Sequence, residues 1–458
     1  MHSEVKTAVV LKIGATISIP CSGIDQELID KFIQGNTFSN PVHKSNELHR
    51  RSNWNIASTI TTYRQEGENL ILPRGYMREI LNSCHENNIV LQIIDDRSES
   101  PCDYPQELKG ISLRPYQKRA VESALQFHQG VVIAPTGSGK SLIALEVLRQ
   151  RQQKALIIVH RADLAKQWAE TIKKHLCLKA GIIGSGQWKI GKEITIAMIQ
   201  TLSSKEKTMG LSNVFGLVLC DECHHLPCQT CFNVMSLLGA KYKYGLSATV
   251  ERRDLLEQMI YRCVGPAIAT ITRKEVEELG ATVPATVMAL ETGFSPTADS
   301  WHAYLTALAA DEDRNLFIIK LATSQISPVL ILCDRVVHGE TLSEMLSKRK
   351  FKHVLAHGQV ADREEVMKKI KKAQITIATT SLIGEGIDVS SWGVLIMASP
   401  ISSEIKLMQA IGRIVRPADG KENAIVYDLR DSCGLSGASF KKRFDIYRKH
   451  RLTVDFDE

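Results

Sequence analysis

The sequence has no long apolar run and no targeting segment. Of its 458 residues 44% are hydrophobic, yet no run approaches the ~18–20 apolar residues that a membrane-spanning helix needs. The first residues show no signal-peptide pattern, and Lys12 interrupts the short apolar run that follows them. These absences predict a cytoplasmic protein without a membrane partner.

Cysteine is also too sparse for a disulfide scaffold. The chain has 11 cysteines, unevenly spread, so we expect reduced thiols. Charged residues make up 23% of the chain and leave a net charge of +7. This mild basic excess is compatible with a polyanion partner and equally with a small-molecule enzyme, so charge alone decides nothing. The length suffices for about three domains of ~150 residues each.

The best-defined feature is a glycine-rich stretch, residues 134–141, between an apolar run that predicts a buried strand and an apolar-periodic run that predicts a helix. In this context a strand-to-helix turn can hold the phosphates of a nucleoside triphosphate, since its backbone N–H groups and the helix N-terminus face them. An ordinary glycine-rich turn is the alternative, and Ala134 stands where the general pattern has glycine. The predicted nucleotide-binding residues are Pro135, Thr136, Gly137, Ser138, Gly139, Lys140 and Ser141.

Within this stretch the two last residues have distinct predicted roles. Lys140 reaches the outer phosphates, and the Ser141 hydroxyl binds Mg²⁺. Upstream, Arg114 and Gln117 directly precede a helix that is predicted from Lys118 to about Gln129. The Gln117 amide presents a donor and an acceptor together, as an adenine edge requires.

Strands and helices alternate after this stretch. Continuous apolar, β-branched runs at residues 155–159, 194–198 and 215–220 predict a parallel sheet that is buried on both faces. The last run ends in Asp221 and Glu222. Asp221 can bind Mg²⁺, and Glu222 can orient and deprotonate an attacking water. A strand that merely ends in acidic turn residues is the alternative.

A second α/β half follows an expected connection near residues 270–286, and it has no phosphate loop of its own. Its residues Gln409, Gly412, Arg413 and Arg416 have helical spacing and would share one helix face. Two arginines on that face could stabilise the charge of a γ-phosphate during transfer. Solvated surface arginines are the alternative for the isolated segment.

Residues 1–105 are expected to form a separate small α+β domain with basic residues in its middle. A stabilising accessory role and a nucleic-acid-binding role both remain open for it. Four cysteines in a C-x₂-C-x₄-C-x₂-C pattern would suggest a metal site elsewhere, but here they overlap Asp221 and Glu222, so free thiols are expected. These cysteines are Cys220, Cys223, Cys228 and Cys231.

The tail, residues 440–451, is predicted to be a basic helix. Phe440, Phe444 and Tyr447 would pack on the second half and leave the basic face in solvent, where contact with DNA phosphates is the other interpretation.

Taken in this order, the motifs resemble those of the superfamily 2 helicases and translocases. The resemblance spans residues 113–428 and looks closest to the XPB, UvsW and type III restriction-subunit group, which includes phage and bacterial branch-migration helicases. The motifs nearest to that group are the Asp-Glu-Cys-His-His box at 221–225, Gly-Leu-Ser-Ala-Thr at 245–249 and Gly-Glu-Gly-Ile-Asp at 384–388.

The resemblance implies further roles for single residues. Arg114 and Gln117 would contact the nucleotide, as would Gly386 and Asp388 of the second half. Arg413 and Arg416 would face the γ-phosphate, with Arg416 as the arginine finger. His224, Ser247, Thr249 and Gln409 would couple hydrolysis to movement. Thr201 and Thr380 would contact the nucleic-acid backbone.

The implied fold is α/β, with two tandem RecA-like parallel-sheet domains behind a small α+β N-terminal domain. We expect domains at 1–105, 106–270 and 271–430, with a basic tail at 431–458. The implied enzyme is an ATP- and Mg²⁺-dependent DNA helicase that moves on and unwinds or branch-migrates forked, branched or duplex DNA in a bacterial or phage-infected cell. The sequence shows no nuclease segment or long C-terminal extension, so we expect either a lone motor or one whose partner is a separate polypeptide.

Three other functions remain open at this point. A duplex translocase would remodel DNA without separating strands. A nucleotide-dependent clamp would bind nucleic acid without productive turnover, although Lys140, Glu222 and Arg416 argue against it. An RNA helicase is the third and is less favoured, because the resembled relatives act on DNA. No residue shows recognition of a 2′-OH.

Overall fold

The computed structural model describes residues 8–225, 228–248, 256–358, 363–383 and 389–456. The chain divides into two compact units. The first comprises Met1–Ala134 and Gly139–Ile271, and the second comprises Pro135–Ser138 and Thr272–Glu458. Within the described ranges, no helix has the length and apolar character to cross a membrane.

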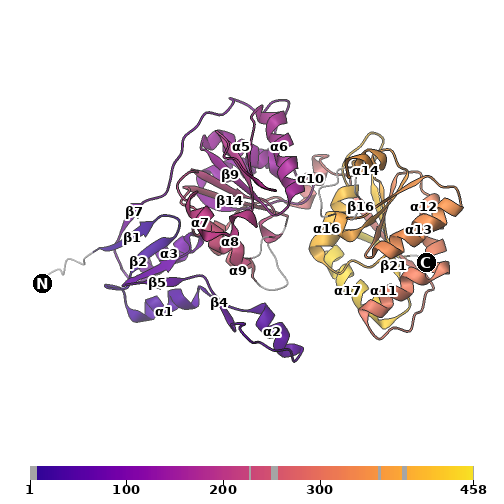
Figure 1. Cartoon of the computed structure of the whole chain (residues 1–458), viewed down its shortest axis with the longest axis horizontal. Helices are drawn as coiled ribbons and strands as arrows, with labels where there is room; N and C mark the ends of the chain where they lie inside the picture. The colour runs from indigo at the N-terminus through magenta and orange to yellow at the C-terminus, as the bar shows by residue number, and fades with distance from the viewer. Residues whose placement is uncertain (1–7, 226–227, 249–255, 359–362, 384–388, 457–458) are drawn as a thin grey trace, which may run out of the picture. The chain divides into compact units, whose positions relative to one another are not determined.

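The first unit begins with a five-stranded sheet of order β5-β6-β2-β1-β7 (Figure 1). Alternate side chains of its strands, such as Leu11 and Ile13, point into one core, as the two-residue period of a half-buried strand requires. Leu28 and Phe32 of α1 and Ile80 of α3 fill that core. The bounds are β1 Val9–Ile13, β2 Ile17–Pro20, β5 Arg64–Glu66, β6 Asn69–Leu72, β7 Leu91–Asp95, α1 Gln26–Gln34 and α3 Met77–Glu86.

Between α1 and β5 the chain forms a projection that we call the arm. It consists of β3 (Thr37–Ser39), α2 (Pro41–Leu48) and β4 (Thr59–Thr61) with the segment between α2 and β4. Strands β3 and β4 pair only with each other in the described structure. The arm extends away from the five-stranded sheet (Figure 1).

The rest of the first unit is built on an eight-stranded sheet of order β11-β10-β12-β9-β13-β14-β8-β15, in which only β11 runs antiparallel to its neighbour. Every residue of β9 and β13 is buried, because helices cover both faces. The predicted runs at 155–159 and 194–198 coincide with β9 and β12. The strands are β8 Gln129–Ile133, β9 Ala155–Val159, β10 Gly181–Gly184, β11 Gln187–Trp188, β12 Ile194–Met198, β13 Leu217–Cys220, β14 Tyr242–Ser247 and β15 Ala267–Thr270. The helices are α4 Pro115–Gln126, α5 Lys140–Arg151, α6 Ala162–Leu176, α7 Lys205–Met209, α8 Cys228–Met235 and α9 Glu257–Val264.

One buried arginine joins the two sheets of the first unit. Arg74 lies in the 3₁₀ turn η1 (Arg74–Tyr76), and its guanidinium donates to the backbone oxygens of Ala240 and Lys241 at 2.5 and 2.8 Å. Beside it, a Cβ on Gly75 would lie 1.8 Å from the Tyr261 oxygen, so only glycine permits this approach of η1 to α9. The N-terminal sheet is therefore fixed against the eight-stranded sheet.

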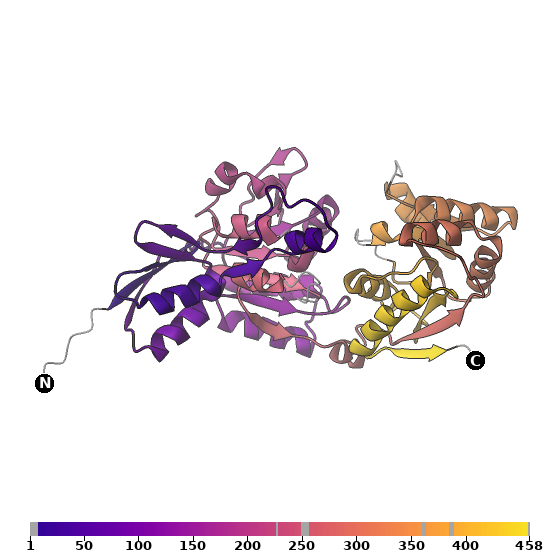
Figure 2. The same cartoon turned by 90° about the horizontal axis from the view of Figure 1, so that it is seen from below.

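The second unit is built on a seven-stranded parallel sheet of order β18-β19-β17-β20-β21-β16-β22 (Figure 2). Its alternate side chains enter two apolar cores, one on each face. The strands are β16 Ala285–Glu291, β17 Val329–Cys333, β18 His353–Ala356, β19 Ile375–Thr379, β20 Val394–Met397, β21 Ala424–Arg430 and β22 Thr453–Phe456. The helices are α10 Arg273–Glu278, α11 Trp301–Ala310, α12 Glu312–Thr323, α13 Val336–Lys348, α14 Arg363–Ile370, α15 Thr380–Ile383, α16 Glu404–Ile414 and α17 Gly434–Lys449.

Candidate functional site

The predicted phosphate loop joins β8 to α5. Gly137 and Gly139 have φ values of +89° and +78°, in the region that favours glycine. A Cβ on Gly139 would also lie 2.4 Å from Gln117 Nε2, so a side chain there would displace the Gln117 amide. Helix α5 begins directly after Gly139, whose carbonyl oxygen accepts from the Leu142 and Ile143 N–H groups at 2.9 and 3.2 Å. The loop thus has the backbone of an anion-binding turn.

Lys140, the first residue of α5, connects the loop to the acidic pair after β13. Its Nζ atom lies 3.3 Å from the Ala134 carbonyl oxygen and 3.3 Å from Glu222 Oε1. Both side chains are mostly buried, with 11% and 20% of their surfaces exposed, so water screens this ion pair only partly. The ammonium group is held between the start of the loop and the acidic pair.

Asp221 lies directly after β13 and is held by two donors. Its Oδ2 accepts from Trp168 Nε1 at 2.7 Å, and its Oδ1 accepts from the Glu222 N–H at 2.9 Å. Burial and the neighbouring Glu222 charge raise its pKa to about 6. A divalent cation would favour the ionised form of such a carboxylate.

No group of three or more histidine, cysteine or acidic side chains in the described part of the chain could hold a metal ion. Mg²⁺ in nucleotide sites needs only one or two protein ligands, because phosphates and waters complete its shell. The hard oxygens of Asp221 and of Ser141, the second residue of α5, fit that requirement.

A chain of polar contacts leads from Glu222 to the end of β14. Glu222 has a φ of +45°, uncommon for a side-chain-bearing residue, and its Oε2 lies 3.4 Å from His224 Nδ1. The same His224 nitrogen lies 2.7 Å from Ser247 Oγ, the last residue of β14. His224 and Ser247 are fully enclosed, with 2% and 0% of their surfaces exposed. Because β14 lies between β13 and β8, the three strand ends meet at one edge of the sheet.

Gln117 lies on α4 and makes a contact within the protein that the sequence did not predict. It is buried, and its Oε1 accepts from the Arg114 N–H at 2.8 Å, which caps the start of α4. The capping bond therefore fixes the Gln117 amide at the start of α4, beside the phosphate loop.

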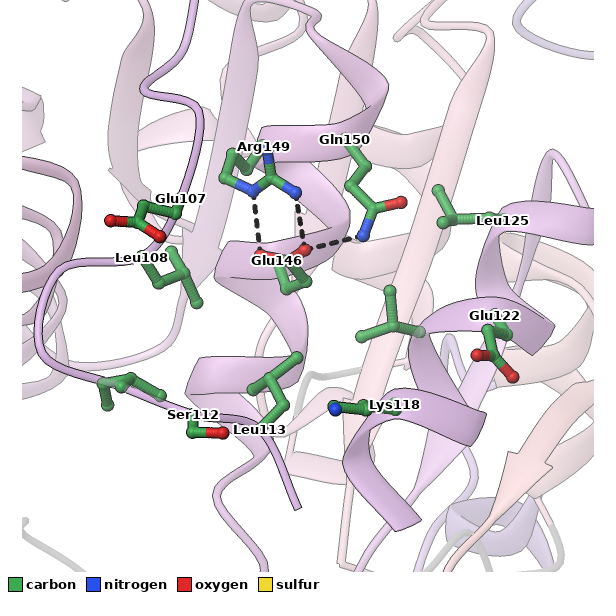
Figure 3. A pocket seen from close by; sticks show the side chains of 12 residues that line it. Glu107, Leu108, Ser112, Leu113, Lys118, Glu122, Leu125, Glu146, Arg149 and Gln150 are labelled. Carbon is green, nitrogen blue, oxygen red and sulfur yellow. Dashed lines mark hydrogen bonds and ion pairs between the residues drawn. The ribbon is translucent and has the colours of Figure 1, made fainter. Parts of the chain in front are cut away.

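A pocket of about 440 Å³ adjoins this segment (Figure 3). It is lined by residues from the 107–113 segment, α4 and α5. Glu146 on its wall accepts from Arg149 at 2.9 and 2.7 Å and from Gln150 at 2.6 Å, so its carboxylate is already satisfied. Leu113 and Lys118 also line the pocket and flank Arg114 and Gln117 in the sequence.

The remaining predicted residues are placed within their own units. Thr201 begins the turn η2 (Thr201–Ser203), shortly after β12 ends. Thr380 begins α15, directly after β19, and its Oγ1 lies 3.4 Å from Asp334 Oδ1. Each threonine follows the carboxyl end of a parallel strand. Thr249, Gly386 and Asp388 lie outside the described residues.

The two predicted arginines of the second unit differ in position. Gln409, Gly412 and Arg413 lie on α16, whereas Arg416 lies two residues beyond its end at Ile414. The expectation that one helix includes both arginines was therefore wrong. Arg416 is half-buried, and burial lowers its pKa.

Sequence reasoning missed two residues near the acidic pair, Trp168 of α6 and Cys263 of α9. The spacing of Ala165, Trp168 and Ile172 in α6 indicates only a core face, and nothing in it predicts a hydrogen bond to Asp221. Cys220, Cys223 and Cys231 gather in the core behind the acidic pair, and Cys263 joins them from α9. A hydrogen bond with Cys231, and then burial, raise the pKa of the Cys220 thiol, and burial raises the pKa of the Cys223 thiol. These cysteines are free thiols in the core.

Two family models match the chain. Residues 110–252 match the type III restriction enzyme res subunit, and residues 313–418 match the helicase conserved C-terminal domain. The chain belongs to the superfamily 2 group of helicases and translocases.

Relatives of this group align over most of the chain. "Probable helicase D10" of Escherichia phage T5 is 27% identical over 87% of this chain and 91% of its own. The ATP-dependent DNA helicase uvsW of Enterobacteria phage T4 is 25% identical, covering 89% of this chain and 88% of that protein. The DNA 3'-5' translocase XPB2 of Sulfurisphaera tokodaii is 26% identical, with coverages of 68% and 80%.

Solved structures show the same fold. A fragment of a type I restriction enzyme HsdR subunit from Vibrio vulnificus YJ016 aligns with a TM-score of 0.57 and 18% identity, over 75% of this chain and 68% of that chain. Dbp5 of S. cerevisiae aligns with a TM-score of 0.56 and 16% identity, over 76% and 91%. The α/β fold with two RecA-like parallel-sheet domains behind a small α+β region is thus confirmed.

Proposed function

We propose that this superfamily 2 protein is an ATP-dependent DNA helicase or translocase that unwinds or branch-migrates forked and branched DNA. The observation that supports this most directly is the connected set Lys140, Glu222, His224 and Ser247. It joins a phosphate loop, an acidic pair and a strand end through contacts of 2.7 to 3.4 Å. A motor needs such a connection, because hydrolysis must change the conformation of elements outside the nucleotide site.

The hydrolytic step assigns a role to each of these residues. The glycine-rich loop binds the phosphates, and Lys140 exchanges its contact with Glu222 for the outer phosphates. Mg²⁺, bound through Ser141 and Asp221, would neutralise phosphate charge. Glu222, freed from the lysine, accepts a proton from the attacking water. Arg413 and Arg416 of the second unit stabilise the charge that develops on the γ-phosphate.

Coupling follows from the buried contacts beyond Glu222. A change in the Glu222 charge environment acts on His224, which has little room to move because it is enclosed, and through it on Ser247 at the end of β14. Thr249 and Gln409 would extend this coupling. Arg114 and Gln117 would hold the base beside the pocket next to α4.

The proposed nucleic-acid contacts are largely independent of sequence. Thr201 and Thr380 would bind backbone phosphates through their hydroxyl groups, one from each unit, so binding should weaken with salt. DNA is favoured over RNA because the names of uvsW and XPB2 state DNA activity. The Dbp5 structure, which is bound to RNA, makes RNA the alternative to test. A bacterial or phage-infected cytoplasm would be the setting.

ATP hydrolysis tests the proposal directly. Turnover is measured without nucleic acid and with single strands, duplex, a fork, a four-way junction and RNA, with Lys140→Ala as the control. Strong stimulation by forks or junctions, lost in the variant, is expected. Stimulation by RNA alone, or no turnover with any substrate, would contradict it. Strand displacement on the fork separates a helicase from a duplex translocase.

A further inference from the structure

The arm exposes several large apolar side chains to solvent. Within α2 no residue is buried, although the helix contains Val42 and Leu48, which are 55% and 81% exposed. Trp54, in the segment between α2 and β4, is 84% exposed. An indole left in water loses the burial that usually stabilises it, so such exposure indicates a binding role.

The exposure of Trp54 does not result from an undefined local backbone. Asparagine side chains fix the tip: Asn46 Nδ2 donates to the Ser52 oxygen at 3.2 Å, and Asn53 Nδ2 donates to the His43 oxygen at 3.2 Å. The Trp54 N–H itself donates to Ser52 Oγ at 3.2 Å. Polar bonds therefore fix the backbone that carries the exposed indole.

The base of the arm is anchored in the N-terminal core. Asn36 is fully buried, and its Nδ2 donates to the Phe32 oxygen at 2.8 Å. Thr62 Oγ1 donates to Asn36 Oδ1 at 3.1 Å, so the residues that precede and follow the arm are joined to each other. At the start of α2, Asn40 caps the helix through the Val42 N–H and also donates to the Ala57 oxygen. The arm is thus a defined projection with fixed ends.

Charge complementarity identifies its partner. Lys44, Arg50 and Arg51 are exposed on the arm, against one acidic residue, Glu47. Three positive charges minus one negative charge leave +2 over residues 36–62. Glu47 Oε1 lies 3.4 Å from His43 Nδ1, so the one acidic side chain of the arm already has a polar contact within it. Exposed cations on the same small arm as an exposed indole suit a polyanion with aromatic faces, whereas the cores of protein interfaces are depleted in charge.

We infer that the arm binds an unpaired base next to a DNA junction, with Trp54 stacked on the base and Lys44, Arg50 and Arg51 on the flanking phosphates. The inference rests on the proposed function and adds a specific binding element to it. The indole face accepts any base, since every base has a π-face, so the arm recognises the absence of pairing rather than a sequence. Its cations add a contribution that does not depend on sequence and that salt weakens.

Direct binding to labelled DNA tests the inference. The nucleotide-free full-length protein is titrated with a fork, an unbranched duplex and a single strand, and Kd is read from fluorescence anisotropy. Trp54→Ala should raise the fork Kd about tenfold, in the range that base stacking supplies, and should change the duplex Kd less than twofold. Trp54→Phe, which keeps a smaller ring, should lie between wild type and alanine.

Matched controls come from the arm itself. Leu48→Ala removes an equally exposed apolar side chain without an aromatic face and should leave the fork Kd within twofold. The double variant Arg50→Glu with Arg51→Glu should weaken binding to all three DNAs and reduce the salt dependence. Thermal melting of each variant reports the fold, and these exposed side chains should leave Tm within about 2 °C.

A fluorescent base at the junction supplies a second readout. With 2-aminopurine as the unpaired base, stacking on Trp54 should quench its emission in wild type and not in Trp54→Ala. If wild type shows fork-stimulated ATPase but Trp54→Ala binds and quenches as wild type does, the arm inference fails and the proposed function stands. If wild type binds no fork, both fail. Unchanged fork binding by the Trp54→Ala variant would indicate that the arm binds a protein partner instead.

Discussion

Lys140 Nζ lies 3.3 Å from Glu222 Oε1, so the proposed phosphate-binding lysine and the proposed catalytic base form an ion pair. The same carboxylate lies 3.4 Å from His224 on its other oxygen. In this arrangement each carboxylate oxygen of Glu222 has a polar neighbour, so the carboxylate is a weaker proton acceptor for a water. Phosphates that take Lys140 would release Glu222, which links nucleotide binding to activation of the base.

Glu222→Gln should abolish turnover while ATP still binds. Glutamine keeps the size of the side chain but cannot accept a proton, and general base catalysis contributes about 10²–10⁴-fold to such rates. We expect kcat to fall at least about a hundredfold, with the Kd for a fluorescent ATP analogue unchanged or lower. Glu206→Gln, an exposed acid on α7, is the control. A kcat within a few-fold of wild type would contradict the role.

Ser247→Ala should separate hydrolysis from movement. The variant removes the hydroxyl that lies 2.7 Å from His224 Nδ1 but leaves Lys140 and both acidic residues in place. We expect DNA-stimulated ATPase within about fivefold of wild type and strand displacement reduced about tenfold or more. A reduction of that size corresponds to the free energy of a lost buried hydrogen bond. Ser347→Ala, exposed on α13, is the control. An equal loss of both activities would show that the contact serves the fold or the chemistry instead.

Arg74→Ala should destabilise the first unit. The change leaves the Ala240 and Lys241 carbonyl oxygens without their donor and also removes the bond to Gln129 Oε1 at 3.1 Å. Loss of a buried charged donor costs roughly 2–4 kcal/mol in the free energy of unfolding. Urea unfolding measures it, with the exposed Arg64→Ala as the control. A loss under about 0.5 kcal/mol, typical of surface changes, would show that the two sheets are held together by other contacts.

The sequence was most informative where strands are buried on both faces. The apolar runs at β9, β12 and β20 could be located because both faces of these strands are buried, so successive residues are nearly all apolar. Strand β16 was partly assigned to a connection, since Ala285, Thr286 and Ala289 give a weak apolar signal. The arm was not predicted, because asparagine bonds rather than an apolar period define it.

Contacts between distant residues explain the other errors. The basic helix of the tail was expected to leave its charges in solvent, yet Arg443 of α17 is fully buried. Its guanidinium donates to both oxygens of Asp428 at 2.8 and 2.7 Å, and the Tyr447 hydroxyl donates to the same carboxylate. A linear pattern cannot distinguish such an arginine from its exposed neighbours Lys441 and Lys442. Trp168 and Asp221 are a similar pair, joined only by the fold.

His338 should make the second unit sensitive to acid. It is buried on α13, and its Nε2 lies 2.9 Å from Asn315 Oδ1. Burial, and then the Arg314 charge, lower its pKa from 6.5 to about 3. Between these two values the unfolded chain binds a proton that the folded chain does not, so the free energy of unfolding falls as pH falls. Above pH 7 both states are neutral and the effect vanishes.

The expected slope is at most about 1.4 kcal/mol per pH unit between roughly pH 6 and pH 4, the value for one proton. Urea unfolding at several pH values measures it in wild type and in His338→Gln, which keeps a donor for Asn315 but does not titrate. The variant starts from a lower stability, because its amide cannot reproduce the imidazole packing, so slopes rather than absolute values are compared. A shallower acid slope in the variant is expected. Identical slopes would show that other groups, such as the carboxylates of the unit, cause the acid sensitivity.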